Sequence, residues 1–366
     1  MERVGLIGLP NSGKTSLFNA LTRGSALVAP HMFSTTETTV GIAQVPDARL
    51  QALSRMSASR KVVPASVEVV DIAGLVEGSS AGEGLGNRFL AGIREMDALC
   101  YVLRGFEDPQ VPGYEAPETA LSVLELELVM ADISSLEGQM ARKRKQARGG
   151  QLSASDLEAM ERALDILQSG VPLYRAGLVE HDQAVLKDLF LLTVKPIFVV
   201  VNVGEDAGAS GVEIADKLSS ELGGAAEALA VSVKLEAEAS LLDPQDASEL
   251  LEGLGLGEGA LPRVAHAAYH LLGRRTFLTT GEKESRAWTF KSGAHAPECA
   301  GVIHSDLQRG FIRAEVIRWD ELLEIGSWSA AKAGGKLRVE GKDYEVQDGD
   351  VLEIRFNVSG SPSRRA

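Results

Sequence analysis

Residues 8–15 read GLPNSGKT and fit the pattern G-x-x-x-x-G-K-[ST]. An apolar run, Val4–Ile7, precedes this loop, and a helix-like run, Ser16–Leu21, follows it. A phosphate-binding loop needs this order of strand, loop and helix, because the backbone N–H groups and the helix N-terminus then point at the phosphates. Lys14 adds a positive charge beside the β- and γ-phosphates, and the Thr15 hydroxyl is a ligand for Mg²⁺. The sequence therefore predicts a nucleotide-binding loop with contacts from Pro10, Asn11, Ser12, Gly13, Lys14, Thr15 and Ser16.

A second motif closes the next apolar run. Residues 71–74 read DIAG and fit D-x-x-G, 57 residues after Lys14. A carboxylate at this strand end can hold the Mg²⁺ shell, and the Gly74 N–H can contact a γ-phosphate. Between the motifs, residues 33–39 (FSTTETT) are rich in hydroxyl groups. Thr35 is the candidate that reaches Mg²⁺ and the γ-phosphate, Thr36 is the second candidate, and a solvated loop is the alternative. The candidate catalytic residues are Lys14, Thr35 and Gly74, and the candidate metal ligands are Thr15, Thr35 and Asp71.

A third motif addresses the base of the nucleotide. Residues 202–205 (NVGE) follow the apolar run Ile197–Val201, where GTPases carry N-K-x-D. The aspartate of that motif accepts hydrogen bonds from guanine, whereas here Glu205 takes its place and Val203 replaces the lysine. We therefore expect guanine specificity to be weakened or lost. The candidate base contacts are Asn202, Val203 and Glu205, together with Ser232 and Val233 of the loop that follows the strand-like run 228–231.

The composition is that of a soluble globular protein, with 45% hydrophobic and 24% charged residues among 366, enough for two or three domains. The net charge of −14 argues against wholesale non-specific binding to nucleic acid. Residues 276–366 carry 13 Lys+Arg against 14 Asp+Glu, a net charge of −1, so electrostatic repulsion of RNA is weakest in this part of the chain. Cys100 and Cys299 fit no metal spacing and are interpreted as buried, reduced thiols. Without a signal peptide or a membrane-spanning run, we expect a cytoplasmic location and no membrane partner.

The periodicity along the chain indicates several parts. Residues 1–112 and 192–275 alternate apolar runs with helical stretches, which is typical of an α/β nucleotide-binding domain. Residues 113–191 carry leucines at helical spacing and predict an inserted helical hairpin with a basic tip at 142–148 and a capping box beginning at Ser155. The basic tip suits contacts with RNA phosphates, and a solvated charge run is the alternative. Residues 276–358 carry strand-like runs at 286–290, 311–317, 336–339 and 351–356 and predict a small α+β domain. His304 is expected in its core, with an RNA-facing surface of His304, Arg309 and Arg313 as the alternative. The tail, residues 359–366, is expected to be disordered.

Taken in this order, the motifs resemble the YchF branch of the Obg-like P-loop proteins, in the TRAFAC class. The resemblance rests on DIAGLVEGSSAGEGLGNRFL from Asp71, TFLTTGEKESRAWT from Thr276 and GVIHSDLQRGFIRAEV from Gly301, and it covers nearly the whole chain. It implies a Ras-like P-loop domain, an inserted coiled-coil hairpin and a C-terminal TGS domain with a ubiquitin-like fold. It also implies ATP and Mg²⁺ as ligands, with ATP preferred over GTP. The hairpin and the TGS domain would face the ribosome and large-subunit RNA, and we expect a monomer.

Two departures from the family pattern concern hydrolysis. The residue after D-x-x-G, which is a water-orienting glutamine in Ras-like enzymes, is Leu75, which has no group that orients water. Many relatives carry a histidine in the loop after F-E-x, but residues 106–114 contain none. His31, near residues 33–39, is the candidate that could replace it, but it is interpreted as a surface residue. Slow intrinsic turnover follows, with the water positioned by backbone, another loop or a partner. Asn11 matches an asparagine that coordinates K⁺ in related GTPases, which makes K⁺ a second candidate cofactor.

Three functions remain open at this point. The first is a slow, ribosome-associated ATPase that acts as a molecular switch in translation or stress. The second is an Obg-type GTPase, if Glu205 still recognises guanine. The third is a nucleotide-gated adaptor with negligible hydrolysis, which Leu75 and the missing loop histidine favour.

Overall fold

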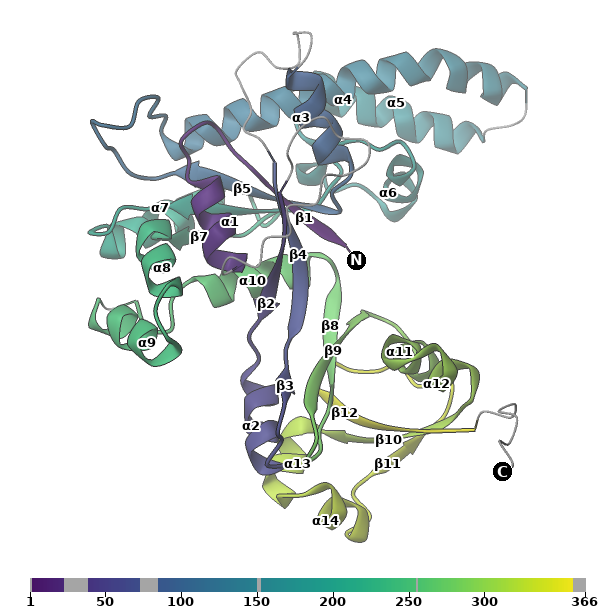
Figure 1. Ribbon diagram of the computed structural model, residues 1–366. Coiled ribbons are helices and arrows are strands. Elements are labelled where there is room, and N and C mark those ends of the chain that lie inside the picture. Colours follow the sequence, from purple (N-terminus) through teal and green to yellow (C-terminus); the bar gives the residue numbers. More distant parts are fainter. Residues whose placement is uncertain (1, 23–38, 73–84, 150–152, 255, 358–366) are drawn as a thin grey trace, which may run out of the picture. The chain divides into compact units, whose positions relative to one another are not determined.

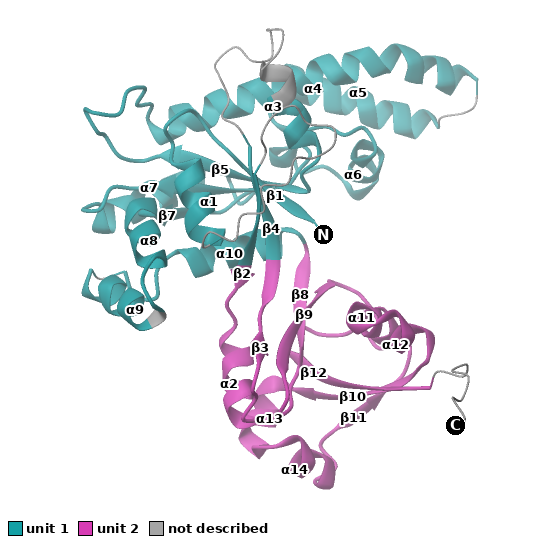
Figure 2. Cartoon of the chain, in the orientation of Figure 1, with its two compact units in different colours: residues 1–43, 67–272 teal, residues 44–66, 273–366 magenta. Residues whose placement is uncertain are grey.

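The computed structural model describes residues 2–22, 39–72, 85–149, 153–254 and 256–357 (Figure 1). The chain forms two compact units, which Figure 2 colours separately. The first unit comprises residues 1–43 and 67–272, and the second comprises residues 44–66 and 273–366. Residues 44–66, which the sequence analysis assigned to the nucleotide-binding domain, thus group with the C-terminal residues. The finer domain boundaries predicted from the sequence remain a prediction.

The first unit is built on a six-stranded sheet with the order β2-β4-β1-β5-β6-β7. Its strands are β1 (Arg3–Ile7), β2 (Thr39–Val45), β4 (Ala65–Asp71), β5 (Ala98–Arg104), β6 (Ile197–Asn202) and β7 (Ala228–Val231). All neighbours from β4 to β7 pair in parallel. The apolar runs at 4–7, 67–71, 98–103, 196–201 and 228–231, which predict strands, correspond to β1, β4, β5, β6 and β7. Because the strands are parallel, their carboxyl ends meet at one edge of the sheet, where ligands bind in folds of this kind.

Helices cover both faces of this sheet. The first unit contains the helices α1 (Lys14–Thr22), α3 (Leu85–Arg94), α4 (Pro117–Arg148), α5 (Ala154–Gln168), α6 (Glu180–Lys187), α7 (Gly208–Glu221), α8 (Val233–Ser240), α9 (Pro244–Gly253) and α10 (Leu261–Leu271), with a 3₁₀ turn at Leu173–Arg175, and some of these pack on the sheet. On one face, α3, α4 and α7 bury leucines such as Leu121 and Leu218 against Tyr101 and Val199. On the other face, Val264 of α10 lies beside Leu6 and Phe198. Successive side chains of a strand point to opposite faces, so burial of every residue of β5 and β6 requires that both faces are covered.

The predicted helical hairpin is formed by α4 and α5, which lie side by side in Figure 1. Leu136 and Met140 of α4 pack with Met160 and Leu167 of α5 in a separate small core. The basic run 142–148 forms the last two turns of α4. The predicted capping box at Ser155 is wrong, because Ser153 is the N-cap and its hydroxyl accepts the Asp156 N–H at 3.0 Å.

The second unit has a mixed sheet with the order β11-β10-β12-β8-β9-β3. Its strands are β3 (Val62–Val63), β8 (Arg274–Thr279), β9 (Ser285–Lys291), β10 (Phe311–Arg318), β11 (Arg338–Glu340) and β12 (Asp350–Phe356), and its helices are α2 (Ala48–Met56), α11 (Ala296–Ile303), α12 (Ser305–Arg309), α13 (Trp319–Ile325) and α14 (Trp328–Ala333). Phe277, Phe290, Val316 and Leu352 are central to its core. The four predicted C-terminal strands are confirmed.

The core position expected for His304 is wrong. Its ring is exposed and caps α12, because Nδ1 accepts the Asp306 N–H at 3.1 Å. Cys100 and Cys299 are buried free thiols, as predicted. Among the described residues, no helix is long and apolar enough to span a bilayer. The predicted fold class, a P-loop α/β domain with an inserted hairpin and a C-terminal α+β domain, agrees with this architecture.

Candidate nucleotide-binding site

The predicted motifs gather at the carboxyl edge of the first sheet. The phosphate-binding loop follows β1, Asp71 is the last residue of β4, and Asn202 is the last residue of β6. The strand register places Leu6 opposite Asp71 and Asn202 opposite Val231. Parallel pairing thus brings together groups that lie more than a hundred residues apart in the sequence.

The phosphate-binding loop needs glycine at position 13. Gly13 has φ of 95°, in the left-handed region, and a Cβ atom there would lie 2.3 Å from Nδ2 of Asn202. That amide nitrogen donates to the carbonyl oxygen of Ser12 at 3.0 Å. Asn202 also accepts the Val233 N–H on its Oδ1 at 3.3 Å. The buried side chain of Asn202 therefore ties the phosphate loop to the start of α8.

Lys14 is buried beneath the loop that it serves. Its Nζ donates to the carbonyl oxygens of Gly8 and Leu9, each at 2.9 Å. Burial lowers the pKa of Lys14 to about 8, and the charge of Asp71 partly opposes this shift. A bound phosphate would supply the negative charge that favours the ammonium form.

Thr15 and Asp71, the two predicted metal ligands among the described residues, lie in contact. The Thr15 hydroxyl donates to Oδ2 of Asp71 at 2.7 Å. Burial raises the pKa of Asp71, while the Thr15 hydrogen bond and the Lys14 charge oppose the rise. The described residues contain no cluster of three or more His, Cys, Asp or Glu side chains that would cage a metal. One hydroxyl and one carboxylate instead fit Mg²⁺, which keeps waters and takes further ligands from phosphates.

A cavity of about 710 Å³ joins the phosphate loop to the predicted base contacts. Its lining includes Asn11, Gly13, Ser16, Asn202, Val203 and Glu205. The Glu205 carboxylate forms an ion pair with Lys234, which also lines the cavity. The hydroxyls of Ser12 and Ser232 are buried and have no hydrogen-bond partner in the described structure. The cavity is of a size that accepts a nucleoside.

Some predicted site residues are not among the described residues that line the cavity. Thr35 and Gly74 lie outside the described residues, as do Leu75 and His31. Pro10 is exposed at the phosphate loop. Sequence reasoning also missed part of the lining, namely Phe106, Glu107, Asp108, Pro109, Val111, Gly204, Lys234, Ala237, Glu238 and Leu241. The position of residues 106–111 just after β5 was the available signal, because every strand of a parallel sheet delivers its following loop to the same edge.

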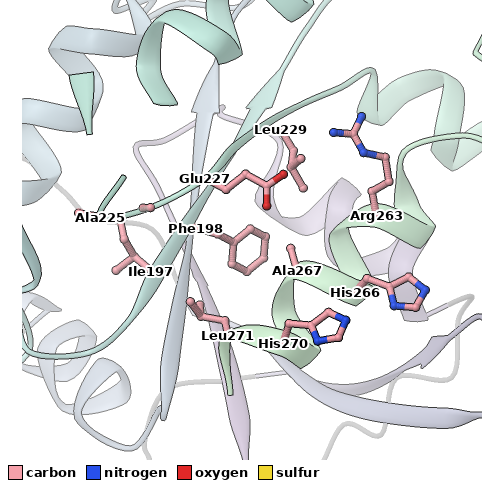
Figure 3. A pocket seen from close by; sticks show the side chains of 11 residues that line it. Ile197, Phe198, Ala225, Glu227, Leu229, Arg263, His266, Ala267, His270 and Leu271 are labelled. Carbon is pink, nitrogen blue, oxygen red and sulfur yellow. The ribbon is translucent and has the colours of Figure 1, made fainter. Parts of the chain in front are cut away.

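A second cavity of about 450 Å³ contains none of the predicted site residues (Figure 3). It involves Ile197 and Phe198 at the start of β6, the end of the sheet opposite the phosphate loop. Figure 3 shows Glu227 on one side and Arg263, His266 and His270 of α10 on the other.

Comparisons with known proteins agree with this geometry. The family model MMR_HSR1, described as a 50S ribosome-binding GTPase, matches residues 3–130. The model YchF-GTPase_C, described as a protein of unknown function (DUF933), matches residues 275–357. The chain is 44% identical over 361 residues to the ribosome-binding ATPase YchF of Bacillus subtilis, covering 97% of this chain and 99% of that protein. The chain belongs to the YchF family.

Further relatives in this family agree. The ribosome-binding ATPase YchF of Haemophilus influenzae is 42% identical over 362 residues, covering 97% of this chain and 99% of that protein. The solved YchF GTPase of Schizosaccharomyces pombe is 28% identical, covers 97% of each chain and superposes with a TM-score of 0.84. The chain is a P-loop nucleoside triphosphatase of this family, and the resemblance noted from its motifs is confirmed.

Proposed function

We propose that the protein is a ribosome-associated ATPase that binds ATP in preference to GTP, hydrolyses it slowly and acts as a switch in the cytoplasm as a monomer. The observation that carries ATP preference is the pair Val203 and Glu205 on the wall of the cavity. Val203 is buried in the core, and its short side chain cannot pack along a guanine ring as the lysine of N-K-x-D does. Glu205 is engaged by Lys234, which competes with the hydrogen bonds that guanine needs from a carboxylate.

The phosphate end supports binding of the nucleotide with Mg²⁺. Lys14 and the loop N–H groups would hold the β- and γ-phosphates, and Thr15 and Asp71 would hold the ion, directly or through water. Mg²⁺ would neutralise charge on the phosphates. Water attacks the γ-phosphorus as the bond to the bridging oxygen breaks, which yields ADP, inorganic phosphate and a proton. We assign Thr35 and Gly74 to the γ-phosphate side.

Potassium is a further part of the proposal. The amide nitrogen of Asn11 donates to the carbonyl oxygen of Pro112 at 3.3 Å, beside the phosphate loop. Equal turnover in KCl and NaCl would remove K⁺ from the proposal.

Ribosome binding is supported by the relatives, which are named for it, and by the end of α4. Exposed cationic side chains gather there at Arg142, Lys145 and Arg148. In a chain with a net charge of −14, such a cluster gives a local positive surface for RNA phosphates.

The test is a calorimetric titration of ATP and GTP into the Mg²⁺-loaded protein, with Val203→Lys/Glu205→Asp as the comparison. We expect tighter binding of ATP by the unmodified protein and a shift toward GTP in the double variant. Tighter GTP binding by the unmodified protein would make it an Obg-type GTPase. Turnover that stays at background with ribosomes present would instead support the nucleotide-gated adaptor.

A further inference from the structure

Arg104 is a buried cation at the edge of the nucleotide cavity that no motif singles out. It is the last residue of β5 and is only 4% exposed. Its guanidinium donates to four backbone carbonyl oxygens of the loop that follows. The acceptors are those of Phe106 at 3.0 Å, Val111 at 3.1 Å, and Pro112 and Asp108 at 3.4 Å each. The loop, residues 105–116, contains neither helix nor strand, so these bonds fix its path.

Aromatic rings complete the surroundings of this guanidinium. Its central carbon lies 4.8 Å from the ring centroid of Phe106 and 5.5 Å from that of Tyr114. A planar, delocalised cation can donate in several directions within its plane while a ring lies against its face. A lysine ammonium has three donors on a single nitrogen and no planar face, so it cannot span the same acceptors while a ring stacks on it. The conformation of the loop 105–116 therefore depends on a guanidinium, which only arginine carries.

The same loop forms one wall of the 710 Å³ cavity. Phe106, Asp108 and Val111 line the cavity, whereas Arg104 does not. The wall is attached at both ends to the rest of the site. The Gly105 N–H donates to the carbonyl oxygen of Asn202 at 2.8 Å, and Asn11 of the phosphate loop donates to Pro112. Displacement of this loop would thus alter the cavity beside Asn202 and leave the lysine and hydroxyl of the phosphate loop in place.

We propose that Arg104 is a positioning residue for the nucleoside end of the bound nucleotide. It acts through the loop 106–112, which it holds in the conformation that completes the cavity. The inference rests on the proposed function only in taking this cavity as the nucleotide site. Its contribution concerns mainly the base and ribose, because its hydrogen bonds reach that wall directly and meet the phosphate loop only at the Pro112 carbonyl oxygen, which Asn11 also contacts.

Comparing the affinities for two ligands distinguishes this positioning role from a general effect of the substitution on folding. ATP·Mg²⁺ uses the whole cavity, whereas tripolyphosphate·Mg²⁺ has no base or ribose and uses only the phosphate loop. Both are titrated into the full chain carrying Arg104→Lys or Arg104→Gln. Arg162→Lys is the matched control, because Arg162 also holds a partner through its guanidinium, the Asp182 carboxylate at 2.7 Å, but lies in the hairpin.

For both Arg104 variants we expect ATP affinity to fall by about tenfold or more, as loss of hydrogen bonds from a charged donor implies. Tripolyphosphate affinity should stay within about twofold, which also shows that the variants are folded. Arg162→Lys should leave both affinities unchanged. Unchanged ATP affinity, or an equal loss for both ligands, would overturn the proposal.

The outcome also separates this inference from the proposed function. If the unmodified protein prefers GTP, the ATP preference is wrong, and the Arg104 proposal then predicts the same selective loss for GTP. If the unmodified protein binds ATP no more tightly than tripolyphosphate, the cavity does not hold a nucleoside and the Arg104 proposal fails.

Discussion

The Thr15 hydroxyl donates a 2.7 Å hydrogen bond to Oδ2 of Asp71, which joins the start of α1 to the carboxyl end of β4. Both groups offer oxygen atoms of the kind that Mg²⁺ prefers. An ion bound here would replace the hydrogen bond with ligand contacts from the same two side chains. The predicted magnesium site therefore depends on the packing of β1, α1 and β4, and not on one sequence motif alone.

The first prediction concerns this pair. Thr15→Ala removes one oxygen ligand, so Mg²⁺-dependent nucleotide affinity should fall by roughly tenfold or more. Thr15→Ser keeps the hydroxyl and should bind almost as the unmodified protein does. Nucleotide titrations over a range of Mg²⁺ concentrations measure the effect. Equal affinities for the alanine and serine variants would show that Thr15 is not a ligand.

The second prediction concerns the attachment of the hairpin. The buried carboxylate of Asp132, on α4, accepts the backbone N–H groups of Leu192 and Thr193 at 2.8 Å each and the Thr193 hydroxyl at 2.7 Å. Asp132→Ala leaves these buried donors without their acceptor, which should lower the free energy of unfolding by about 3 kcal/mol.

Urea unfolding measures this loss, and faster amide hydrogen exchange at Leu192 and Thr193 locates it. Asp165→Ala, an exposed position on α5, is the control and should change the free energy of unfolding by less than about 0.5 kcal/mol. An Asp132→Ala variant as stable as this control would contradict the assigned role.

The third prediction concerns pH and the second unit. Hydrogen bonds from Arg355, at 3.1 and 3.3 Å, lower the pKa of the buried Glu315, and the ammonium of Lys332 at 3.5 Å acts in the same direction. A lowered folded-state pKa means that the unfolded chain takes up the proton first as the pH falls. The stabilisation is therefore complete above the ordinary value of 4.5 and is lost as the pH falls through the lowered pKa.

We expect Glu315→Gln to be less stable than the unmodified protein at neutral pH and to show a flatter loss of stability in acid. Tryptophan fluorescence can follow this, because all three tryptophans, Trp288, Trp319 and Trp328, lie in the second unit. Glu345→Gln, at an exposed position of the same unit, is the control. If stability fell with pH in the same way for the unmodified protein and for Glu315→Gln, protonation of Glu315 would not contribute to the acid sensitivity.

The fourth prediction concerns the proposed ribosome contact. Replacing Arg142, Lys143, Lys145 and Arg148 together by glutamine should weaken cosedimentation with ribosomes, and the slope of log affinity against log salt should become less negative by up to about three. Arg144→Gln is the control, because Arg144 pairs with Glu161 at 3.1 Å and is partly neutralised. Unchanged binding by the fourfold variant would place the contact elsewhere.

Local features of this protein were readable from consecutive residues. The phosphate-binding loop is a run of eight residues, and its conformation depends on Gly13 and its immediate neighbours. The strands appeared as short apolar runs because both faces of the parallel sheet are covered by helices. Helix ends were less certain. Ser153 and Ser155 are both able to cap α5, and only the backbone conformation selects Ser153.

What the sequence by itself determined is the family, the order of the elements and the edge of the sheet at which the motifs meet. Only the tertiary structure decided the role of Arg104, because its acceptors are backbone carbonyls, which every residue carries and which leave no pattern in the sequence. The same holds for Asp132, whose backbone partners are about 60 residues away. Residues 44–66 join the second unit for a related reason. Val62 pairs with Ser285, and hydrogen bonding between strands so distant in the chain depends on how the whole backbone folds.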